Sequence, residues 1–270
     1  MSDNALYNGS YDISMETTKY SNRCVVVIPL YKEFLSTYEQ ISLMQCNKVL
    51  KQYKKVFICP QGLNYSSYED LLNGEVKYYS QEFFRSVESY NDLMLQRFLY
   101  EDFLPYDYML IYQLDGFVFF DGIAKFLDMD LDYVGAPWLD GMRVYRYNFK
   151  GVCMLSRLLP NIFKYIDVFV GNGGVSLRRI ESFCRLFDLY EGQINKWRYN
   201  EDVLYGYLGT MRPNTFRLAD IATALQFAFE TNPQECYEKN NFQLPCFCHA
   251  WEKYDIGFWR KIFQKYGYSI

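Results

Sequence analysis

This chain of 270 residues has a single histidine, His249, and no excess of basic charge. Its 28 lysines and arginines are outnumbered by 32 aspartates and glutamates, which leaves a formal net charge of -4. Proteins whose main partner is a nucleic-acid polymer usually present a strongly basic face. We therefore expect no nucleic-acid polymer among the partners of this protein.

Targeting segments, long apolar runs and paired cysteine spacings are lacking as well. The first twenty residues are polar and acidic, without the basic start and apolar centre of a secretory signal. No uninterrupted apolar stretch is long enough to span a bilayer. The eight cysteines show no disulfide framework, and a lone Cys246-Phe-Cys248-His249 cluster is weak evidence for zinc. We expect a cytoplasmic protein with reduced thiols, with peripheral contact at the inner membrane face left open.

Half of the residues are hydrophobic and 20% are aromatic, so the chain can bury a full core. Apolar runs that end at proline or glycine alternate with segments of helical spacing over the first 120 residues. This alternation predicts an α/β protein with a mainly parallel sheet. The expected strands are 24–29, 55–59, 75–79 and 108–114, and the expected helices are 33–53 and 89–104, the second opened by Ser89 as N-cap.

The second half of the chain follows a less regular pattern, without repeats or a clear linker. We expect a single domain over residues 23–270, preceded by a loose leader over 1–22. Within it we expect a short strand at 133–138, an irregular segment at 139–160, a strand at 168–176 broken by glycines, helices at 177–190 and 202–208, a strand at 225–229 and a basic amphipathic tail.

Asp115 is the most informative residue, because it ends the apolar run 108–114 and is followed by Gly116. In open α/β sheets, ligands bind at the carboxyl ends of the strands. A carboxylate there can hold a divalent cation, which in turn can hold a diphosphate. The alternative is that Asp115 only caps the turn before Gly116.

Three further segments contain candidate binding or catalytic residues. The run Gly171-Asn172-Gly173-Gly174 lets the backbone approach a ligand or form a tight turn, and it matches neither the phosphate-loop nor the dinucleotide spacing. Asn200-Glu201-Asp202 offers either ordinary helix capping or a carboxylate for proton transfer. His249 is either structural or a partner for a carboxylate-bound divalent ion.

The order of these pieces resembles that of the functional elements in GT-A-type glycosyltransferases. More closely, the chain looks like an uncharacterised bacterial glycosyltransferase-like family, and the resemblance spans about residues 23–262. The segments that carry it are Ile-Tyr-Gln-x-Asp at 111–115, Val-Gly-Ala-Pro-Trp at 134–138, Gly-Asn-Gly-Gly-x-Ser-Leu-Arg at 171–178, Asn-Glu-Asp-Val at 200–203 and Cys-His-Ala-Trp-Glu-Lys-Tyr-Asp at 248–255.

This resemblance implies a single GT-A-like domain with a mainly parallel, Rossmann-like central sheet flanked by helices. Residues 23–120 would form the nucleotide-sugar-binding half, and residues 121–270 the acceptor-binding and catalytic half. The implied activity moves a sugar from a nucleotide-diphosphate sugar, expected to be a UDP-sugar, to a hydroxyl of a glycan or lipid-linked glycan. The expected context is bacterial surface polysaccharide or glycoconjugate assembly, with inversion at the anomeric carbon.

The resemblance also implies roles for individual residues. Asp202 looks like the general base, with Glu201 as the alternative. Asp115 and His249 look like ligands of a divalent cation, Mn²⁺ or Mg²⁺. The implied donor-binding residues are Pro29, Leu30, Tyr31, Gln113, Leu114, Asp115, Gly173 and Gly174, and the acceptor-binding residues are Trp138, Asn172 and Trp251.

Gln113 departs from the family pattern, because it stands where the metal-binding Asp-x-Asp element has its first acid. One carboxylate binds a cation less well than two, so this departure supports a different interpretation. The alternative is a non-catalytic nucleotide- or carbohydrate-binding module that kept the fold. A glycosidase is a weaker enzyme alternative, which would need two facing carboxylates and no nucleotide.

Overall fold

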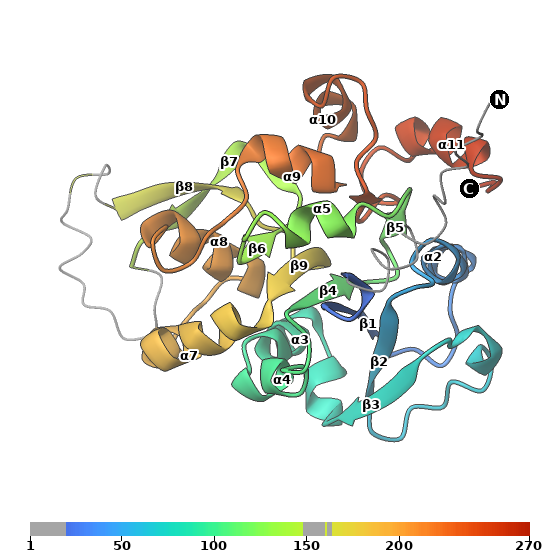
Figure 1. Cartoon of the computed structure of the whole chain (residues 1–270), viewed down its shortest axis with the longest axis horizontal. Coiled ribbons are helices and arrows are strands. Elements are labelled where there is room, and N and C mark those ends of the chain that lie inside the picture. Colours follow the sequence, from blue (N-terminus) through green and yellow to red (C-terminus); the bar gives the residue numbers. More distant parts are fainter. Residues whose placement is uncertain (1–19, 148–159, 161–163) are drawn as a thin grey trace, which may run out of the picture.

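The computed structural model describes residues 20–147, 160 and 164–270 of the chain (Figure 1). Most of the predicted leader, 1–19, lies outside the described residues. Its end is ordered against the domain, because the Tyr20 hydroxyl donates to Asp128 over 2.5 Å. The strands are β1 Cys24–Pro29, β2 Lys54–Pro60, β3 Glu75–Tyr79, β4 Tyr108–Tyr112, β5 Phe117–Val118, β6 Tyr133–Val134, β7 Pro137–Tyr145, β8 Tyr165–Val170, β9 Val175–Arg179, β10 Ala228–Phe229 and β11 Phe247–Cys248.

Helices connect and cover these strands. The α-helices are α2 Thr37–Val49, α3 Val87–Met94, α4 Arg97–Glu101, α5 Ile123–Leu127, α7 Ile180–Ile194, α8 Glu201–Met211, α9 Ile221–Phe227, α10 Pro233–Lys239 and α11 Ile256–Lys265. Short 3₁₀ turns, η1 Glu69–Leu71 and η2 Gln81–Phe84, precede β3 and α3. No helix in the described part of the chain is both long and apolar enough to cross a bilayer.

The central sheet has the strand order β3-β2-β1-β4-β9-β6. The strands β3, β2, β1 and β4 pair in parallel, whereas β9 is antiparallel to both β4 and β6. This mainly parallel sheet is the predicted one, and the predicted bounds of β1, β2, β3 and β4 agree with the structure to within two residues. The carboxyl ends of β1 and β4 therefore lie side by side at one edge.

Helices flank both faces of this sheet, so the domain has three layers (Figure 1). Alternate residues of β1 point to opposite sides: Val25 and Val27 join one core, whereas Val26 and Ile28 join the other. The first core is closed by residues of α3, α4, α7 and α8, and the second by residues of α2 and α5. This two-sided burial explains the continuous apolar runs in the sequence.

Two smaller sheets complete the fold. One has the order β10-β11-β5 and the other pairs β7 with β8. The pairing of β7 with β8 corrects the prediction for 139–160, because residues up to Tyr145 form an antiparallel strand, with a shift of register between Pro137 and Met142. Residues 148–159 of that segment lie outside the described residues.

The predicted helix over 89–104 is two helices, and Ser89 is not its N-cap. Ser86 caps α3, accepting from the Ser89 amide over 3.2 Å, and the Ser89 hydroxyl completes the capping box. The helix ends at Met94, whose carbonyl accepts from the hydroxyls of Tyr100 (2.9 Å) and Tyr205 (2.8 Å). These side-chain donors replace the amides that a continuing helix would supply.

Two other predicted elements differ in the structure. Residues 225–227 belong to helix α9, and only Ala228 and Phe229 form a strand. The reason is Asp220, which accepts from the Thr223 amide over 2.7 Å and starts the helix. The predicted helix 177–190 begins at Ile180, because residues 175–179 are β9 and pair with β4.

Candidate active site

A cavity of about 460 Å³ opens at the carboxyl ends of β1 and β4. This size is in the range of small-molecule sites. The opposite wall is formed by residues 84–87, before and at the start of α3, and by Tyr90 within it. Six of the residues predicted to bind the donor line the cavity: Pro29, Leu30, Tyr31, Gln113, Leu114 and Asp115.

The small sheet β10-β11-β5 brings Asp115, Glu230 and His249 together. Cys248 of β11 pairs with Phe117 of β5 on one side and with Phe229 of β10 on the other, so the flanking residues converge. Asp115 Oδ1 lies 3.1 Å from His249 Nε2, and Glu230 Oε1 lies 3.1 Å from His249 Nδ1. The imidazole is therefore held between two carboxylates.

The charges of this cluster depend on each other. Burial lowers the pKa of His249, but Asp115 and Glu230 outweigh the burial and raise it to about 10. Burial raises the pKa of Asp115. The charge of His249 and the nearby hydrogen bonds lower it, and together they outweigh burial, so the pKa of Asp115 lies below its usual value. Without a ligand, the pair is therefore an imidazolium beside a carboxylate at neutral pH.

The same pair fits part of a divalent-cation site. Asp115 Oδ1 and His249 Nε2 are buried and face each other, yet their geometry is not that of a hydrogen bond. Neighbouring ligands around octahedral Mg²⁺ are about 3 Å apart, close to the separation here. Among the described residues, no three His, Cys, Asp or Glu side chains gather to hold a metal. The pair thus fits a cation that takes its other ligands from a substrate and water.

The glycine run makes room for side chains of the protein itself. A Cβ on Gly173 would lie 2.1 Å from Glu201 Oε1, and a Cβ on Gly174 would lie 2.0 Å from His249 Nε2. The residue of this run in the left-handed conformation is Asn172, with φ of 66°. Gly173 and Gly174, predicted to bind the donor, do not line the large cavity. They lie between His249 and the start of α8.

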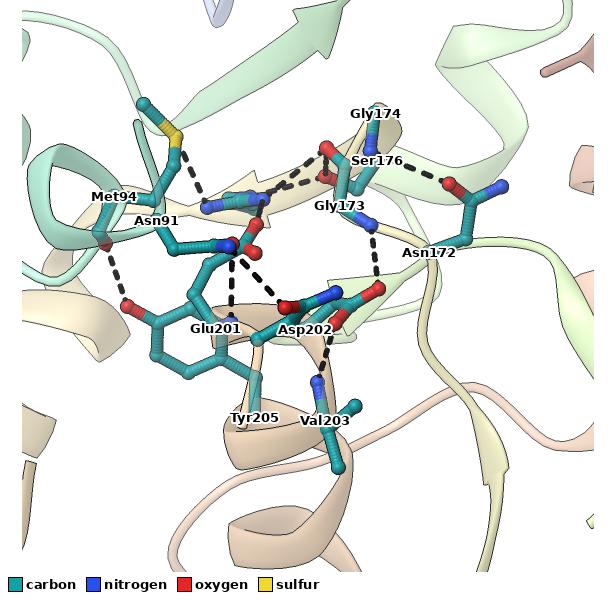
Figure 2. A network of polar contacts seen from close by, with 12 residues as sticks. Asn91, Met94, Asn172, Gly173, Gly174, Ser176, Glu201, Asp202, Val203 and Tyr205 are labelled. Carbon is teal, nitrogen blue, oxygen red and sulfur yellow. Dashed lines mark hydrogen bonds and ion pairs between the residues drawn. The ribbon is translucent and has the colours of Figure 1, made fainter. Parts of the chain in front are cut away.

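Asp202, the predicted base, lies at the start of α8 and contacts this glycine run (Figure 2). Its carboxylate accepts from the Gly173 amide over 3.2 Å and from the Val203 amide over 2.7 Å. Burial, followed by repulsion from Glu201, raises the pKa of Asp202 to about 7. The dipole at the start of α8 would by itself lower this pKa, but burial and the neighbouring charge outweigh it.

Glu201, the alternative base, has a different environment from Asp202. Its side chain is buried and its Oε1 accepts from Arg178 Nη2 over 2.8 Å. Asn200 occupies the N-cap position of α8, but its side chain makes no capping hydrogen bond, unlike the prediction. The Asn200 Oδ1 instead accepts from Asn91 Nδ2 of α3 over 3.2 Å.

The residues predicted to bind the acceptor do not form one surface. Trp251 is completely buried and packs on Tyr38, with ring centroids 4.8 Å apart, so its predicted stacking on a sugar is wrong for this structure. Trp138 is half-buried in β7 beside Gly171, where an added Cβ would lie 1.9 Å from its ring. Asn172 is 1% exposed, and its Nδ2 has no hydrogen-bond partner among the described residues.

Sequence reasoning missed two residues of this region, Glu230 and Arg178. Glu230 follows a strand of two residues, β10, which carries too little pattern to predict. Arg178 ends the motif Gly-Asn-Gly-Gly-x-Ser-Leu-Arg, and a basic residue next to the apolar Val175 and Leu177 was the available signal for a buried ion pair. The structure shows it completely buried.

A family model described as "Protein of unknown function (DUF5672)" matches residues 73–249. The match covers most of the chain, and the protein belongs to this family. No curated protein matches the sequence.

Several solved structures of glycosyltransferases align with the chain. One is LgtC, a galactosyltransferase in complex with donor and acceptor sugar analogues, at 15% identity and TM-score 0.47 over 83% of this chain and 86% of that one. GlyE of Streptococcus pneumoniae aligns at 14% identity and TM-score 0.47 over 90% and 59%. Core-mannan synthase A of Aspergillus fumigatus, an Mn/GDP form, aligns at 9% and 0.45 over 69% of each chain. These distant likenesses assign no activity, so the proposal below depends on the site.

Proposed function

We propose that this protein is a nucleotide-sugar-dependent glycosyltransferase. The observation that carries the proposal is the cavity at the sheet edge, which is lined by Asp115, together with His249 beside Asp115 and the buried carboxylate of Asp202, whose pKa is raised in part by Glu230 on the other side of the imidazole. The Asp115–His249 pair suits the binding of a diphosphate and its counter-ion, and Asp202 suits proton transfer. These are the two functions that transfer of a glycosyl group from a nucleotide diphosphate needs.

The proposed donor site is the cavity beside β1 and β4. Leu30 and Leu114 give it an apolar floor, and the ring of Tyr31, 53% exposed, supplies a face for a nucleobase. Arg85 adds positive charge to the wall, which suits a negatively charged diphosphate, whereas Lys32 is paired with Glu39 over 2.7 Å. We propose a UDP-sugar as the donor, with Asp115 at the diphosphate end.

Asp115 and His249 are the residues that would hold a divalent cation, Mn²⁺ or Mg²⁺. When bound, such a cation neutralises the leaving diphosphate. The imidazole must give up its Nε2 proton to become a ligand, and Glu230 on the other ring nitrogen would hold the Nδ1 proton in place. Gln113 stands in place of a first acid and lines the cavity, and its backbone N–H donates to the Gly174 carbonyl over 2.8 Å.

The proposed chemical step is a direct displacement. The acceptor hydroxyl oxygen bonds to the anomeric carbon while the bond from that carbon to the diphosphate oxygen breaks. The hydroxyl proton passes to the Asp202 carboxylate, and the nucleoside diphosphate leaves with the bond's electron pair. A pKa near 7 suits this role, because an efficient base has a pKa near the working pH. Attack opposite the leaving group inverts the anomeric centre.

The proposed acceptor is a saccharide hydroxyl of a glycan or lipid-linked glycan, as in assembly of a bacterial surface polysaccharide or glycoconjugate. Asn172 supports a polar acceptor, because its buried Nδ2 has no hydrogen-bond partner among the described residues and lies in the loop that contacts Asp202. The exposed part of Trp138 remains a proposed stacking surface for the sugar ring.

The test is a donor screen followed by a turnover assay. Thermal shift with UDP-, GDP- and TDP-sugars, each with and without Mn²⁺, identifies the donor by its stabilisation of the fold. Release of nucleoside diphosphate is then measured with a panel of oligosaccharide acceptors. We expect one donor class to stabilise the protein more with the cation, and its turnover to depend on an acceptor. Absence of stabilisation by every nucleotide sugar would refute the proposal.

The alternative, a non-catalytic nucleotide- or carbohydrate-binding module, is supported by Gln113. It predicts donor stabilisation in the thermal shift but no release of nucleoside diphosphate with any acceptor or with water. The raised pKa of Asp202 favours the enzyme, because a binding module has no need for a buried carboxylate near its point of titration.

A further inference from the structure

Arg178 is a fully buried cation whose five N–H donors each meet one acceptor. Nε donates to Ser176 Oγ (3.0 Å), and Nη1 donates to Tyr100 Oη (2.9 Å) and Met94 Sδ (3.6 Å). Nη2 donates to the Gly173 carbonyl (3.2 Å) and to Glu201 Oε1 (2.8 Å). The guanidinium therefore ties the glycine run and the start of α8 to α3 and α4.

Aromatic rings surround this cation on the remaining sides. The guanidinium carbon lies 5.8, 5.7 and 5.6 Å from the ring centres of Tyr133, Phe183 and Tyr205. Such a setting excludes water, and a charge in it must be paired. Glu201 is the carboxylate that pairs with it, at a side-chain exposure of 5%.

The two adjacent acids, Glu201 and Asp202, point in different directions from the start of α8 (Figure 2). Glu201 turns toward Arg178 and fills the space beside Gly173 that a Cβ would need. Asp202 turns toward the other side of the loop, where it accepts from the Gly173 amide. The carbonyl and the amide of Gly173 are thus bound by Arg178 and Asp202, respectively. One residue of the loop links the cation to the proposed base.

We propose that Arg178 is a positioning residue that determines which of the two acids accepts the acceptor proton. By binding Glu201 and the Gly173 carbonyl at once, it removes Glu201 from the site and fixes the loop against which Asp202 is held. This inference rests on the proposed function and extends it to a residue that contacts no substrate.

The charge of Glu201 has a second effect in this arrangement. The groups that face Asp202 are the carboxylates of Glu201 and Glu230, the amides of Gly173 and Val203, and the ring of Tyr133. The two carboxylates and burial raise the pKa of Asp202, and the two amides lower it. Although it is paired with Arg178, Glu201 therefore helps to raise the pKa of Asp202, while its own carboxylate stays out of reach of the acceptor.

The experiment uses the ligand-free protein first, so that its result does not depend on turnover. Carboxyl carbons of aspartate are labelled with ¹³C, and the Asp202 resonance is assigned by its loss in Asp202→Asn. We expect Glu201→Gln, which keeps the acceptor for Arg178 but removes the charge, to lower the midpoint of the Asp202 titration. Glu181→Gln, an exposed first-turn acid of α7, is the matched control and leaves the midpoint unchanged. An unchanged midpoint in Glu201→Gln would overturn the proposal.

The second measurement is turnover of the full chain with the donor found in the screen. Lysine cannot satisfy five acceptors, so Arg178→Lys releases the loop, and we expect kcat to fall about 10²-fold with little change in donor KM. In Glu201→Gln, the acid limb of the kcat/KM profile moves to lower pH by the amount seen in the titration. Loss of turnover in Glu201→Gln together with near-normal turnover in Asp202→Asn would overturn the proposal.

These two measurements separate the inference from the proposed function. If the Asp202 midpoint shifts in Glu201→Gln but the protein shows no turnover, the proposed glycosyltransferase function is refuted and the Arg178–Glu201 arrangement is supported. If Arg178→Lys does not fold, circular dichroism and size-exclusion chromatography show it, and the comparison of turnover in Glu201→Gln and Asp202→Asn decides which acid accepts the proton.

Discussion

The carboxylate of Asp115 lies 3.1 Å from the imidazole Nε2 of His249, although the two residues are far apart in the sequence. The antiparallel pairing of β5 with β11 brings them together, and β10 adds Glu230 on the other side of the ring. The three polar residues lie within two positions of the ends of these short strands, so the strand pairing fixes where they stand relative to one another. This fixed placement suits a site that must hold a small ion or a diphosphate oxygen.

We expect Asp115→Asn to keep the fold and to weaken cation-dependent donor binding by about 10-fold or more, since even indirect supports of a metal site are worth 10–100-fold. Isothermal titration calorimetry of the donor with and without Mn²⁺ measures the difference. Asp140→Asn, at an exposed position of β7, serves as the matched control. Equal affinity of the variant and the original protein in the presence of Mn²⁺ would exclude the role of Asp115.

Asp202→Asn is expected to lose transfer by about 10²–10⁴-fold while its donor affinity stays the same. The reason is that the amide cannot accept the acceptor proton, whereas Asp202 does not line the donor cavity. Single-turnover rates and equilibrium binding of the donor separate the two effects. Near-normal rates in this variant would show that another group accepts the proton.

The rate should depend on pH through Asp202. Because burial and Glu201 raise its pKa to about 7, the carboxylate is protonated below that pH and cannot act as a base. We expect kcat/KM to fall about tenfold per unit below pH 7 and to level off above it. A profile that stays flat from pH 5 to pH 8 would contradict this assignment.

The raised pKa of Asp202 also affects the stability of the fold, which is favoured at low pH, whereas the rate is favoured at high pH. A folded-state pKa raised above its unfolded value gives stability that is present below about pH 4 and is lost as pH rises through about 7. We therefore expect Asp202→Asn to gain stability relative to the original protein between pH 4 and pH 8. Urea unfolding at pH 5 and pH 8 tests this, and a smaller advantage at pH 8 than at pH 5 would be the wrong sign.

Gly174→Ala should displace the imidazole of His249, since the added Cβ would lie 2.0 Å from Nε2. We expect a loss of about 1–3 kcal/mol of stability, as for overpacked cores, together with loss of cation-dependent donor binding. The matched control is Gly192→Ala in α7, where nothing lies within 4 Å of the new Cβ. In a double-mutant cycle with His249→Ala, we expect the two losses of stability to be less than additive, and an additive loss in the double variant would argue against the clash.

The sequence was sufficient for the parts of the fold that have a strong local pattern. Apolar runs ended by proline or glycine predicted β1 to β4, and the strand-end position of Asp115 predicted the edge where the cavity opens. The sequence was insufficient where a pattern is short, or where two neighbouring residues fit it equally well. Ser86 and Ser89 are equally good caps by type, and only the packing of Val87 to Met94 selects Ser86.

Tertiary packing accounts for the rest of the differences. The pKa of Asp202 depends on burial and on Glu230, which enters the site from a two-residue strand. The burial of Trp251 depends on Tyr38 and on the tail helix α11, which contributes Phe263. Neither environment is encoded within a few residues of the side chain concerned, so no local pattern could predict them.

The glycine run has a consequence for how this family can diverge. Gly171 and Trp138 occupy one shared volume, as do Gly173 and Glu201. A relative with a side chain in place of Gly171 or Gly173 must have a smaller residue in place of Trp138 or Glu201, because there is no space for both. Across the family, these positions should therefore vary as pairs. A chain that keeps both glycines is one that still needs the indole of Trp138 and the carboxylate of Glu201 where they are.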